Sequence, residues 1–401
     1  MVRPKLHYIS LMRLPTERAH GLQIMQNCEA FAAAGCKVTL WVSRRWNTPQ
    51  MRRITDPYAY YGVESNFRIR RLPCLDLFPL FPAESAGARF AFYLLTLSYA
   101  LVMLFALPFI RADIFYSRDE SLLALLSWIK PKRTLAYEAH LFPSSRRGAA
   151  LQRTVCQGVG SVVAITPQLR DDLVEKRQAA PDRTIAAHDG IRRARFETLS
   201  TTFEARRSLA WDDNAFIVGY VGSLKMIGLD KGVDTLLSAV ANVEGAQLAL
   251  VGGQSADAQA LKRQWTELGL PEERFFHLEH VPPGDVPLYL RAFDVCAMPH
   301  PATAQFARYT SPLKLFEYMA AGGAIVASDL PGWSDVLRDG ETALLLPPDN
   351  VAAWSAAICA LKQDSELRRK LGANAREQVM ANYTWTVRAE RILAHLEAGF
   401  A

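Results

Sequence analysis

Residues 308–323 read RYTSPLKLFEYMAAGG, and the apolar run AIVAS follows them at residues 324–328. Apolar residues within the first stretch recur at helical spacing, and the Gly-Gly pair at its end is a typical helix stop. Ser311 is placed to cap this helix, with Pro312 at the first helical position. The apolar run that follows is typical of a buried strand of a parallel sheet. The stretch therefore predicts an α/β domain.

The start of this predicted helix is a favourable place for an anion. The N–H groups of Leu313 and Lys314 have no partner within the helix, and the helix dipole places positive charge at the same end. The cation of Lys314 in the first turn is mildly unfavourable unless an anion binds there. Glu317, about one turn further on, is placed to accept both hydroxyls of a ribose. The pattern indicates a phosphate and ribose site, against the alternative of an ordinary surface helix.

Length and composition narrow the possible classes of protein. The 401 residues suffice for two domains of roughly 150–200 residues each, and half of them are hydrophobic. The net charge of +6 fits an anionic partner such as a nucleotide or a membrane surface. No RNP-like aromatic pattern, zinc-ligand spacing or basic recognition helix is present, so we expect no nucleic acid partner. The six scattered cysteines form no Cys-x-x-Cys, which indicates reduced thiols in a cytoplasmic protein. A strand pattern begins almost at once, so we expect no signal peptide.

The first half of the chain alternates strand and helix patterns, which is typical of a doubly wound sheet. Its predicted strands are residues 6–10, 36–42, 113–117, 134–137, 161–165 and 184–187. The first loop lacks G-x-G-x-x-G, which argues against a dinucleotide site. Gly21 begins the first helix, where a glycine lets a ligand approach the backbone, and His20 precedes it. Arg118, His140 and Asp189 follow strands, and groups at strand carboxyl ends line the crevice of such a sheet. His20 and His140 are each equally compatible with a structural role.

Residues 90–110 contain no charge and are long enough to span a membrane. Strand patterns flank them on both sides, and a span would place strands of one sheet on opposite sides of the bilayer. An interfacial, half-buried helix is favoured over a fully buried core helix and over a span. Arginines and aromatic residues at 44–71 and the apolar loop at 78–82 lie nearby in sequence, which favours contact with a membrane surface. The alternative is that these residues merely cover the domain core.

The second half repeats the alternation after residues 191–214, which are charged, lack strand patterns and are predicted to be a linker. Predicted strands follow at residues 216–221, 246–251, 275–278, 295–298 and 324–327, with a helix starting at Val233. The two halves together predict two Rossmann-like domains that face each other across a cleft that holds the ligands.

Four stretches taken together resemble the retaining glycosyltransferases of family four, the group 1 transferases with the GT-B fold. They are residues 14–35 (LPTERAHGLQIMQNCEAFAAAG), 216–239 (FIVGYVGSLKMIGLDKGVDTLLSA), 311–350 (beginning SPLKLFEYMAAGG) and 382–393 (NYTWTVRAERIL). The resemblance covers nearly the whole chain. It implies an acceptor-binding domain at residues 1–200, a nucleotide-sugar-binding domain at 201–385, and a helix at 386–401 that crosses back to the first domain.

The resemblance also implies roles for particular residues. Lys231 would hold the diphosphate of a nucleotide sugar together with the amides of Leu313 and Lys314, and Glu317 would hold the ribose. His140 would meet the sugar at the floor of the cleft. The remaining donor-site positions are Gly21, Gly222, Ser223, Tyr309 and Ser311. The positions expected to face the acceptor are His20, Arg118 and Asp189. No metal ion or other cofactor is expected, because lysine and the helix dipole neutralise the phosphates.

Two positions depart from the family pattern. Tyr309 stands where the first glutamate of the Glu-x7-Glu motif is usual, and Ser223 stands where an arginine is usual. Lys225 and Arg308 lie nearby in sequence and could supply charge. The departures leave open which group contacts the donor sugar.

The implied reaction moves a sugar from a nucleoside-diphosphate sugar to a hydroxyl, with retention of configuration. The apolar and basic character of the first half favours a lipid-linked or membrane-surface glycan acceptor, as in cell-envelope polysaccharide synthesis, at the inner face of the cytoplasmic membrane. One alternative is a soluble transferase that acts on a small metabolite. Another is a non-catalytic GT-B protein that binds a nucleotide or glycan as a scaffold.

Overall fold

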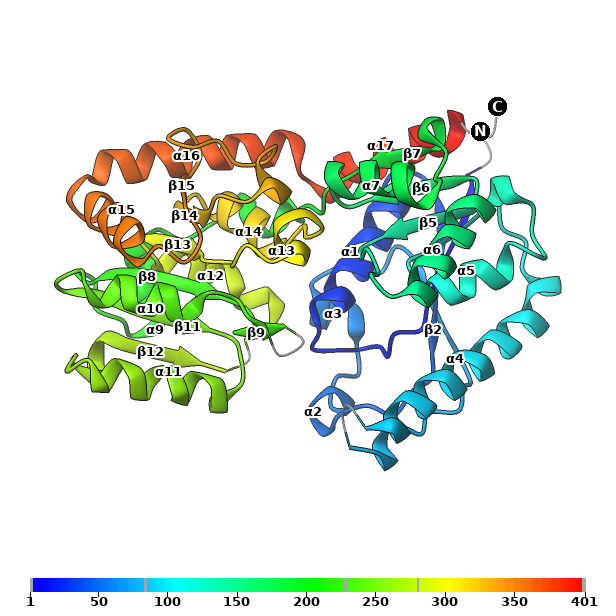
Figure 1. Cartoon of the computed structure of the whole chain (residues 1–401), viewed down its shortest axis with the longest axis horizontal. Coiled ribbons are helices and arrows are strands. Elements are labelled where there is room, and N and C mark those ends of the chain that lie inside the picture. Colours follow the sequence, from blue (N-terminus) through cyan, green and yellow to red (C-terminus); the bar gives the residue numbers. More distant parts are fainter. Residues whose placement is uncertain (1–2, 83–84, 227–228, 280, 399–401) are drawn as a thin grey trace. The chain divides into compact units, whose positions relative to one another are not determined.

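The chain folds into two compact units, each built on one parallel sheet (Figure 1). The computed structural model describes residues 3–82, 85–226, 229–279 and 281–398. The first unit comprises Met1–His188 and Trp385–Ala401, and the second comprises Asp189–Thr384. The expected α/β class with two Rossmann-like domains is confirmed. The first division of the chain comes after His188, whereas the sequence placed it after residue 200.

The first unit holds a seven-stranded sheet in the order β3-β2-β1-β4-β5-β6-β7. All of its paired strands are parallel. The strands are β1 (Lys5–Ser10), β2 (Lys37–Ser43), β3 (Arg68–Leu72), β4 (Ile114–Ser117), β5 (Leu135–Ala139), β6 (Ser161–Ala164) and β7 (Thr184–Ala186). The order of connection reverses between β1 and β4, so the carboxyl ends of these two strands flank a topological switch point, the usual ligand site of such sheets.

The second unit holds a six-stranded sheet in the order β12-β11-β8-β13-β14-β15. The strands are β8 (Phe216–Val221), β11 (Ala246–Val251), β12 (Phe275–Leu278), β13 (Val295–Met298), β14 (Ala324–Ser328) and β15 (Leu344–Leu346). Apolar side chains on both faces of this sheet pack into two buried clusters beneath the covering helices. Its switch point lies between β8 and β13, which places the loops that follow these strands at the expected ligand site.

Helices connect the strands and cover both sheets. Those of the first unit are α1 (Ala19–Ala33), α4 (Ala86–Ala106), α5 (Glu120–Leu126), α6 (Arg146–Gly158) and α7 (Pro167–Arg177), with the short α2 (Pro49–Arg52) and α3 (Pro57–Tyr61). Those of the second are α9 (Thr202–Leu209), α10 (Val233–Ala241), α11 (Ser255–Glu267), α12 (Val286–Ala292), α14 (Leu313–Ala321), α15 (Val351–Gln363) and α16 (Ser365–Asn382), with the short α8 (Ala194–Glu197) and α13 (Ala304–Arg308).

The last helix, α17 (Trp385–Ala398), returns to the first unit and lies beside α1 (Figure 1). The indole N–H of Trp385 donates to Gln26 Oε1 at 2.6 Å, and Arg388 donates to Asn27 Oδ1 at 3.1 Å. Both acceptors are buried side chains of α1. Polar bonds to buried groups therefore fix this helix against α1. Residues 399–401 of the expected returning segment lie outside the described residues.

The expected linker at residues 191–214 is wrong, because this stretch forms α8 and α9 and packs within the second unit. Arg206 of α9 is buried, and it donates to the carbonyls of Ala292 and Asp213, both at 2.9 Å, and to Asp294 Oδ2 at 2.6 Å. The charge of this stretch, which favoured a linker, is therefore partly paired inside the fold. A capping box between Thr201 and Glu204 marks the start of α9 and is visible in the sequence.

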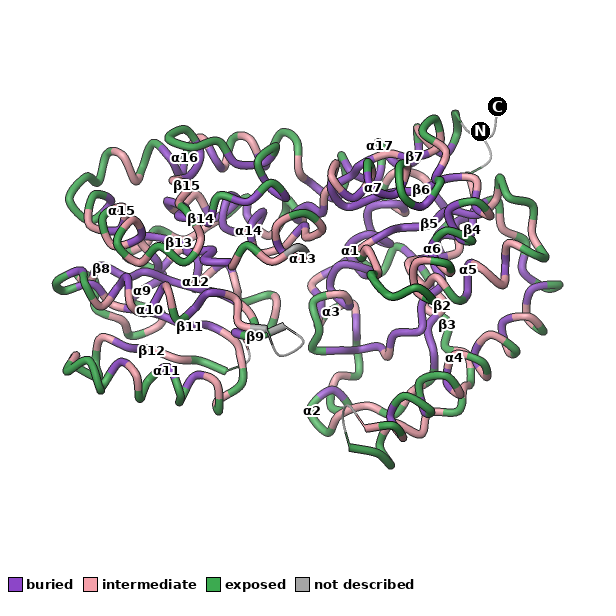
Figure 2. The backbone as a smooth tube through the Cα atoms, viewed as in Figure 1, coloured by how far each residue is buried: buried purple, intermediate pink, exposed green. Residues whose placement is uncertain are grey.

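The apolar segment at residues 90–110 lies mostly in α4, which is half-buried (Figure 2). One stripe of the helix packs on the sheet, and Tyr99 donates its hydroxyl to the carbonyl of Trp41 at 3.2 Å. The opposite stripe is apolar and exposed, reaching 78% at Phe105. A fully buried core helix is therefore excluded. By length and composition alone the stretch Ala86–Phe109 could cross a membrane. However, it connects β3 and β4 of a single sheet.

Two adjacent arginines of α9, Arg206 and Arg207, provide a matched test of whether residues 191–214 pack within the second unit. We expect Arg206→Ala to lower the free energy of unfolding by about 3 kcal/mol, because Asp294 loses its charge partner and the carbonyls of Ala292 and Asp213 lose their donor. The exposed Arg207 serves as the control, and Arg207→Ala is expected to change stability by less than about 1 kcal/mol. Urea unfolding measures both. Equal effects of the two substitutions would contradict the structure of this segment.

Candidate active site

The helix that starts after the stretch SPLK is α14, and it begins at Leu313 rather than at Pro312. Pro312 is the residue that precedes the helix, and Ser311 does not cap it, which corrects the expected N-cap. The Ser311 hydroxyl instead accepts the backbone N–H of Asp189 at 3.0 Å. Ser311 is buried, and its bond ties the start of the second unit to the loop in front of α14. This interaction was not predictable from local capping preference, because its donor is distant in sequence.

Two lysine side chains come together next to the start of α14. Lys314 Nζ lies 3.9 Å from the centre of the Tyr220 ring and donates to the Tyr220 hydroxyl at 2.7 Å. Lys231 Nζ donates to Ser223 Oγ at 2.7 Å. The Tyr220 hydroxyl in turn donates to the Ser223 carbonyl at 2.9 Å, so one hydrogen-bonded group links both lysines.

The surroundings of these lysines disfavour their own positive charge. Burial lowers the pKa of Lys231 to about 8, against a small opposing effect of Asp230. Burial also lowers the pKa of Lys314 well below its ordinary value, and the charge of Lys231 lowers it further. The pKa of the buried His300 is lowered by burial and then by both lysines. No ion pair joins either lysine to a carboxylate of the described residues. Repelling cations without a counter-charge are stabilised by an anion, so this is a candidate phosphate site.

Glycines let the backbone come close to this site. Gly222 follows β8 with φ of +120°, and a side chain there would lie 3.8 Å from Lys314 Nζ. Gly232 precedes α10 with φ of +80°, and an added Cβ would overlap the carbonyl oxygen of Pro299 at 1.6 Å. Asp230 Oδ1 accepts the N–H of Gly232 and, at 3.1 Å, that of Val233. This turn fixes the position of Lys231.

Glu317 lies on α14 and is almost enclosed. Burial raises the pKa of its carboxyl group, while Arg195 of α8 opposes that shift by an ion pair at 3.3 Å. Arg195 also donates to the carbonyl of Pro283. The arginine therefore holds Glu317 by its Oε1 atom. Arg195 was missed because it lies in the stretch that was read as a linker.

The two departures from the family pattern have defined surroundings. Ser223 accepts the hydrogen bond of Lys231, so it positions a lysine at the place where an arginine is usual. Lys225 is engaged by Asp257 at 2.8 Å and does not replace that arginine. Tyr309 ends α13, and its N–H bonds to the carbonyl of Gln305 at 3.1 Å.

A buried carboxylate organises the corresponding edge of the first unit. Glu138 of β5 is fully buried and accepts from Asn27 at 3.0 Å and from the Tyr116 hydroxyl. Arg388 of α17 forms an ion pair with it at 3.1 Å. His140 Nε2 lies 2.5 Å from Glu138 Oε1. Burial by itself would raise the pKa of Glu138, but Arg388, His140 and Tyr116 outweigh burial and hold the pKa below its ordinary value.

The expected residues of the first unit lie together at its switch point. Gln23 of α1 links them, because its Nε2 lies 3.1 Å from His140 Nε2 and its Oε1 accepts from Arg118 at 2.5 Å. His20 begins the same helix, and its pKa is lowered to about 4 by burial and then by Arg118 and other nearby cations. The imidazole of His20 is therefore neutral at pH 7. The sequence identified three of these four side chains and missed Gln23.

Two further expected residues have structural contacts of their own. A Cβ on Gly21 would meet Thr16 and the Tyr61 hydroxyl, each at 2.5 Å, so close packing within the first unit already requires a glycine here. Asp189 is buried in the second unit, where its N–H bonds to Ser311. It therefore does not belong to the unit from which the acceptor site was expected.

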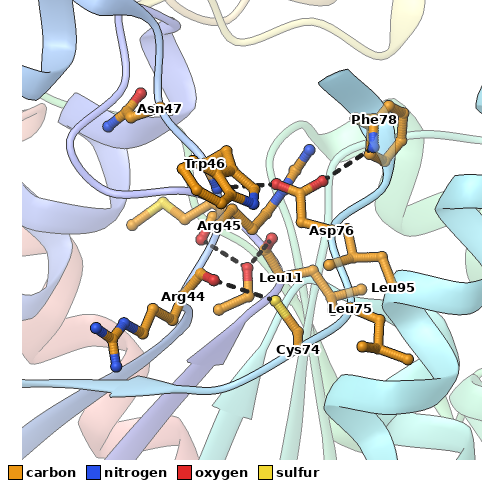
Figure 3. Close-up of polar contacts among 12 residues, drawn as sticks. Leu11, Arg44, Arg45, Trp46, Asn47, Cys74, Leu75, Asp76, Phe78 and Leu95 are labelled. Atoms are coloured by element: carbon orange, nitrogen blue, oxygen red, sulfur yellow. Dashed lines mark hydrogen bonds and ion pairs between the residues drawn. The ribbon is translucent and has the colours of Figure 1, made fainter. Parts of the chain in front are cut away.

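A cavity of about 660 Å³ opens beside the loops that follow β2 and β3 (Figure 3). The buried carboxylate of Asp76 joins these loops, since it accepts the N–H of Trp46 at 3.0 Å and that of Phe78 at 3.3 Å. Arg45 pairs with Asp76 at 3.3 Å and lies 4.8 Å from the centre of the Phe78 ring. The ring of Trp46 is 67% exposed at the cavity wall. Fixed loops therefore present an exposed indole at the carboxyl edge of the sheet.

One part of the chain matches a known protein family, and this part lies in the second unit. The model of the family described as "Glycosyl transferases group 1" matches residues 201–378. This part of the chain is similar to the group 1 glycosyltransferases. The match contains β8, the turn at Lys231 and α14, and thus the whole candidate phosphate site.

Individual relatives agree with this family. The chain is 28% identical over 244 residues to "D-inositol 3-phosphate glycosyltransferase" of Corynebacterium diphtheriae, which covers 58% of this chain and 54% of the relative. It is 33% identical over 167 residues to "Phosphatidyl-myo-inositol mannosyltransferase" of Mycolicibacterium smegmatis, covering 41% and 40%. The chain thus matches only about half the length of these curated relatives. A solved sucrose-phosphate synthase from Thermosynechococcus elongatus matches 99% of both chains with a TM-score of 0.77 at 19% identity, which shows a shared GT-B fold.

The network around Glu138 predicts a defined dependence of stability on pH. Because its folded pKa is lower than the ordinary value of 4.5, the ionised carboxylate stabilises the fold above that pH, and this stabilisation is lost as the pH falls below it. We expect Glu138→Gln to destabilise the protein at pH 7 and to flatten the fall in stability below pH 4.5. Unfolding in urea across the acid range measures both effects. The exposed Glu390 of α17 is the control, and an identical pH profile for Glu138→Gln and Glu390→Gln would contradict the role of the network.

Proposed function

We propose that the protein is a retaining glycosyltransferase that uses a nucleoside-diphosphate sugar. The observation that carries this proposal is the pair of lysines next to the start of α14, which repel each other and lack a carboxylate partner among the described residues. A diphosphate supplies the missing negative charge. The free N–H groups at the start of α14, including those of Leu313 and Lys314, donate to the same phosphates.

The proposed donor site extends from the phosphates to the ribose. Glu317 accepts the ribose hydroxyls, and Arg195 holds its carboxylate in place for this role. Gly222 and Ser223 border the phosphates, and Tyr309 lies at the end of the helix that precedes α14. In this proposal the lysines neutralise the leaving group and no metal ion is needed. Among the described residues no group of three or more His, Cys, Asp or Glu side chains is placed to hold a metal ion.

The proposed reaction breaks the bond between the anomeric carbon and the diphosphate oxygen and forms a bond to the acceptor oxygen on the same face. The leaving diphosphate takes the proton of the acceptor hydroxyl. Positive charge that develops on the sugar ring is short-lived, so the enzyme acts mainly by positioning and by stabilising the leaving group. Glu138 is fully buried and paired, which argues against its use as a nucleophile of the glycosidase type.

Residues of the first unit are proposed to bind the acceptor and the transferred sugar. His140, held by Glu138 and Gln23, contacts the sugar, and His20 and Arg118 face the acceptor. Gly21 is proposed, as the family resemblance implies, to pack against the phosphate end of the donor. The cavity beside Trp46 lies at the same carboxyl edge of the sheet and extends this acceptor site. An exposed indole supplies an apolar face for a sugar ring, and the neighbouring Arg52, which forms no ion pair among the described residues, favours an anionic acceptor.

The proposed acceptor is a lipid-linked or membrane-surface glycan of cell-envelope polysaccharide synthesis. This part of the proposal is supported by the exposed apolar stripe of α4 and by a relative whose name specifies a phosphatidyl-inositol acceptor. The protein then works at the inner face of the cytoplasmic membrane. A second candidate, transfer to a soluble phosphorylated metabolite, is favoured by the relative named for D-inositol 3-phosphate. It requires no lipid for activity.

The lysine site is tested by substitution. We expect Lys231→Ala and Glu317→Ala to lower the rate of sugar transfer by about 10²–10³-fold, because each removes a group that holds the donor. Lys262→Ala is the control, since Lys262 is an exposed lysine of α11 paired with Glu272. The assay follows release of nucleoside diphosphate with and without a lipid-linked acceptor. Turnover like that of the wild type in either variant would overturn the site. Nucleotide binding with no release under any condition would favour the scaffold alternative.

The acceptor cavity is tested separately at Trp46. We expect Trp46→Ala to raise the KM for the acceptor about fivefold, because stacking on an aromatic ring is worth roughly 1 kcal/mol, and to leave nucleotide binding unchanged. Trp128, which is 85% exposed and does not line this cavity, is the matched control. Acceptor kinetics at saturating donor measure the effect. An unchanged KM for Trp46→Ala would show that the cavity does not bind the acceptor.

A further inference from the structure

A second cavity of the first unit, of about 550 Å³, lies beside the C-terminal end of α4. It adjoins the start of β1 and of β2, and thus the opposite edge of the sheet from the switch point. None of the residues that line this cavity belongs to the proposed donor or acceptor site. Its polar lining consists mostly of cations: Lys5, Lys37, Arg68, Arg70, Arg71 and Arg111.

The register of the sheet explains why so many cations meet there. In the parallel pairs, Lys5 lies opposite Lys37, and Trp41 lies opposite Arg70. Side chains two residues apart share a face of a strand. Lys5 and His7 therefore stand on the same face as Lys37, Thr39 and Trp41, and so do Arg68 and Arg70 on the edge strand β3. The alternation that builds the sheet thus concentrates charge on one face.

These cations are not neutralised within the fold. No carboxylate lines the cavity, and within the described residues none of the six cations forms an ion pair. The nearest acidic group, Asp113, accepts the backbone N–H of Lys5 at 2.7 Å and influences His7. Burial and then the charge of Lys5 lower the pKa of His7 to about 4, so its ring is neutral at pH 7. The cavity as a whole therefore attracts a ligand that carries more than one negative charge or a phosphate.

The remaining wall of the cavity is apolar and continues the exposed stripe of α4. Ala106, Phe109 and Ile110 line the cavity, and Phe109 is 88% exposed. The stripe extends from there along the helix at intervals of four residues, through Phe105, Leu101, Leu97 and Tyr93. A ligand that fits both features has an anionic head beside the arginines and an apolar part along α4. This is the chemistry of an anionic phospholipid.

We propose that this cavity binds the phosphate-bearing headgroup of an anionic membrane lipid, with the exposed stripe of α4 lying in the membrane surface. The inference adds a lipid site to the membrane contact of the proposed function and rests on that contact, but not on the donor site. Helices with an apolar face beside clustered arginines bind anionic interfaces in this way. The arginines are suited to phosphate because each guanidinium can donate two parallel hydrogen bonds.

The test compares vesicle binding of two variants with equal charge. In Arg70→Ala/Arg111→Ala two exposed arginines of the cavity are removed, and in the control Arg153→Ala/Lys370→Ala two exposed cations elsewhere are removed. Flotation is measured with phosphatidylcholine vesicles that contain or lack phosphatidylglycerol. We expect the cavity variant to lose about thirtyfold in binding to the anionic vesicles, since each basic residue near such a surface is worth roughly 1 kcal/mol. The control is expected to lose less than about threefold.

Several outcomes would overturn the proposal. Equal losses in both variants would mean that general charge attraction, and not the cavity, holds the protein. Equal binding of the wild type to both kinds of vesicle would remove the headgroup from the interaction. The third outcome is competition: if millimolar glycerol phosphate in solution abolishes flotation of the wild type with the anionic vesicles, the cavity binds a free phosphate ester and not a lipid headgroup. Thermal stabilisation by nucleotides is measured in parallel. Its retention in the cavity variant separates failure of the lipid site from failure of the proposed donor site.

Discussion

The constraint on which the second unit depends is the pair of lysines, Lys231 and Lys314, that come together without an ion pair to any carboxylate of the described residues. Like charges at such a place cost free energy, and burial increases that cost. The fold maintains the arrangement with several local devices: the Tyr220 hydroxyl under Lys314, the Ser223 hydroxyl beside Lys231, and a glycine turn that no larger residue fits. A structure that holds such an unfavourable pair in place favours the binding of an anion, and this supports the proposed donor site independently of the similarity to the group 1 glycosyltransferases.

The first unit is organised around a single buried negative charge, the carboxylate of Glu138. Glu138 is enclosed, and besides the nearby His140 its partners come from β4, α1 and α17, which are far apart in the sequence. The C-terminal helix therefore contributes directly to the position of His140, although it lies about 250 residues away along the chain. The same unit carries opposite chemistry at the two edges of its sheet. The carboxyl edge holds the histidines and the tryptophan cavity, whereas the amino edge holds the cationic cavity at the end of α4.

Periodicity and turn chemistry predicted the half-buried helix α4 and the strands of both parallel sheets except β3 and β15, which lie at the sheet edges. They predicted less well where a side chain acts through a distant partner. Ser311 was assigned as a cap from its local sequence, but it bonds to Asp189. Residues 191–214 were predicted to be a linker from their charge, but the fold buries Arg206 of this stretch and pairs it with Asp294. Gln23 and Arg195 carry no motif, and only the fold brings them to His140 and Glu317. Glu138 had a visible signal, since Glu138 and His140 are two residues apart at a strand end and so share one face.

The most direct test of the lysine site is the protonation of Lys231 itself, followed by NMR of its side chain as the pH is varied. In the free protein the pKa is expected to be about 8. A bound nucleoside diphosphate favours the charged ammonium, so the account predicts that the pKa rises when UDP, GDP or ADP binds. A pKa of Lys231 that stays the same in the presence of a nucleotide that does bind would show that the diphosphate lies elsewhere, and would contradict the account.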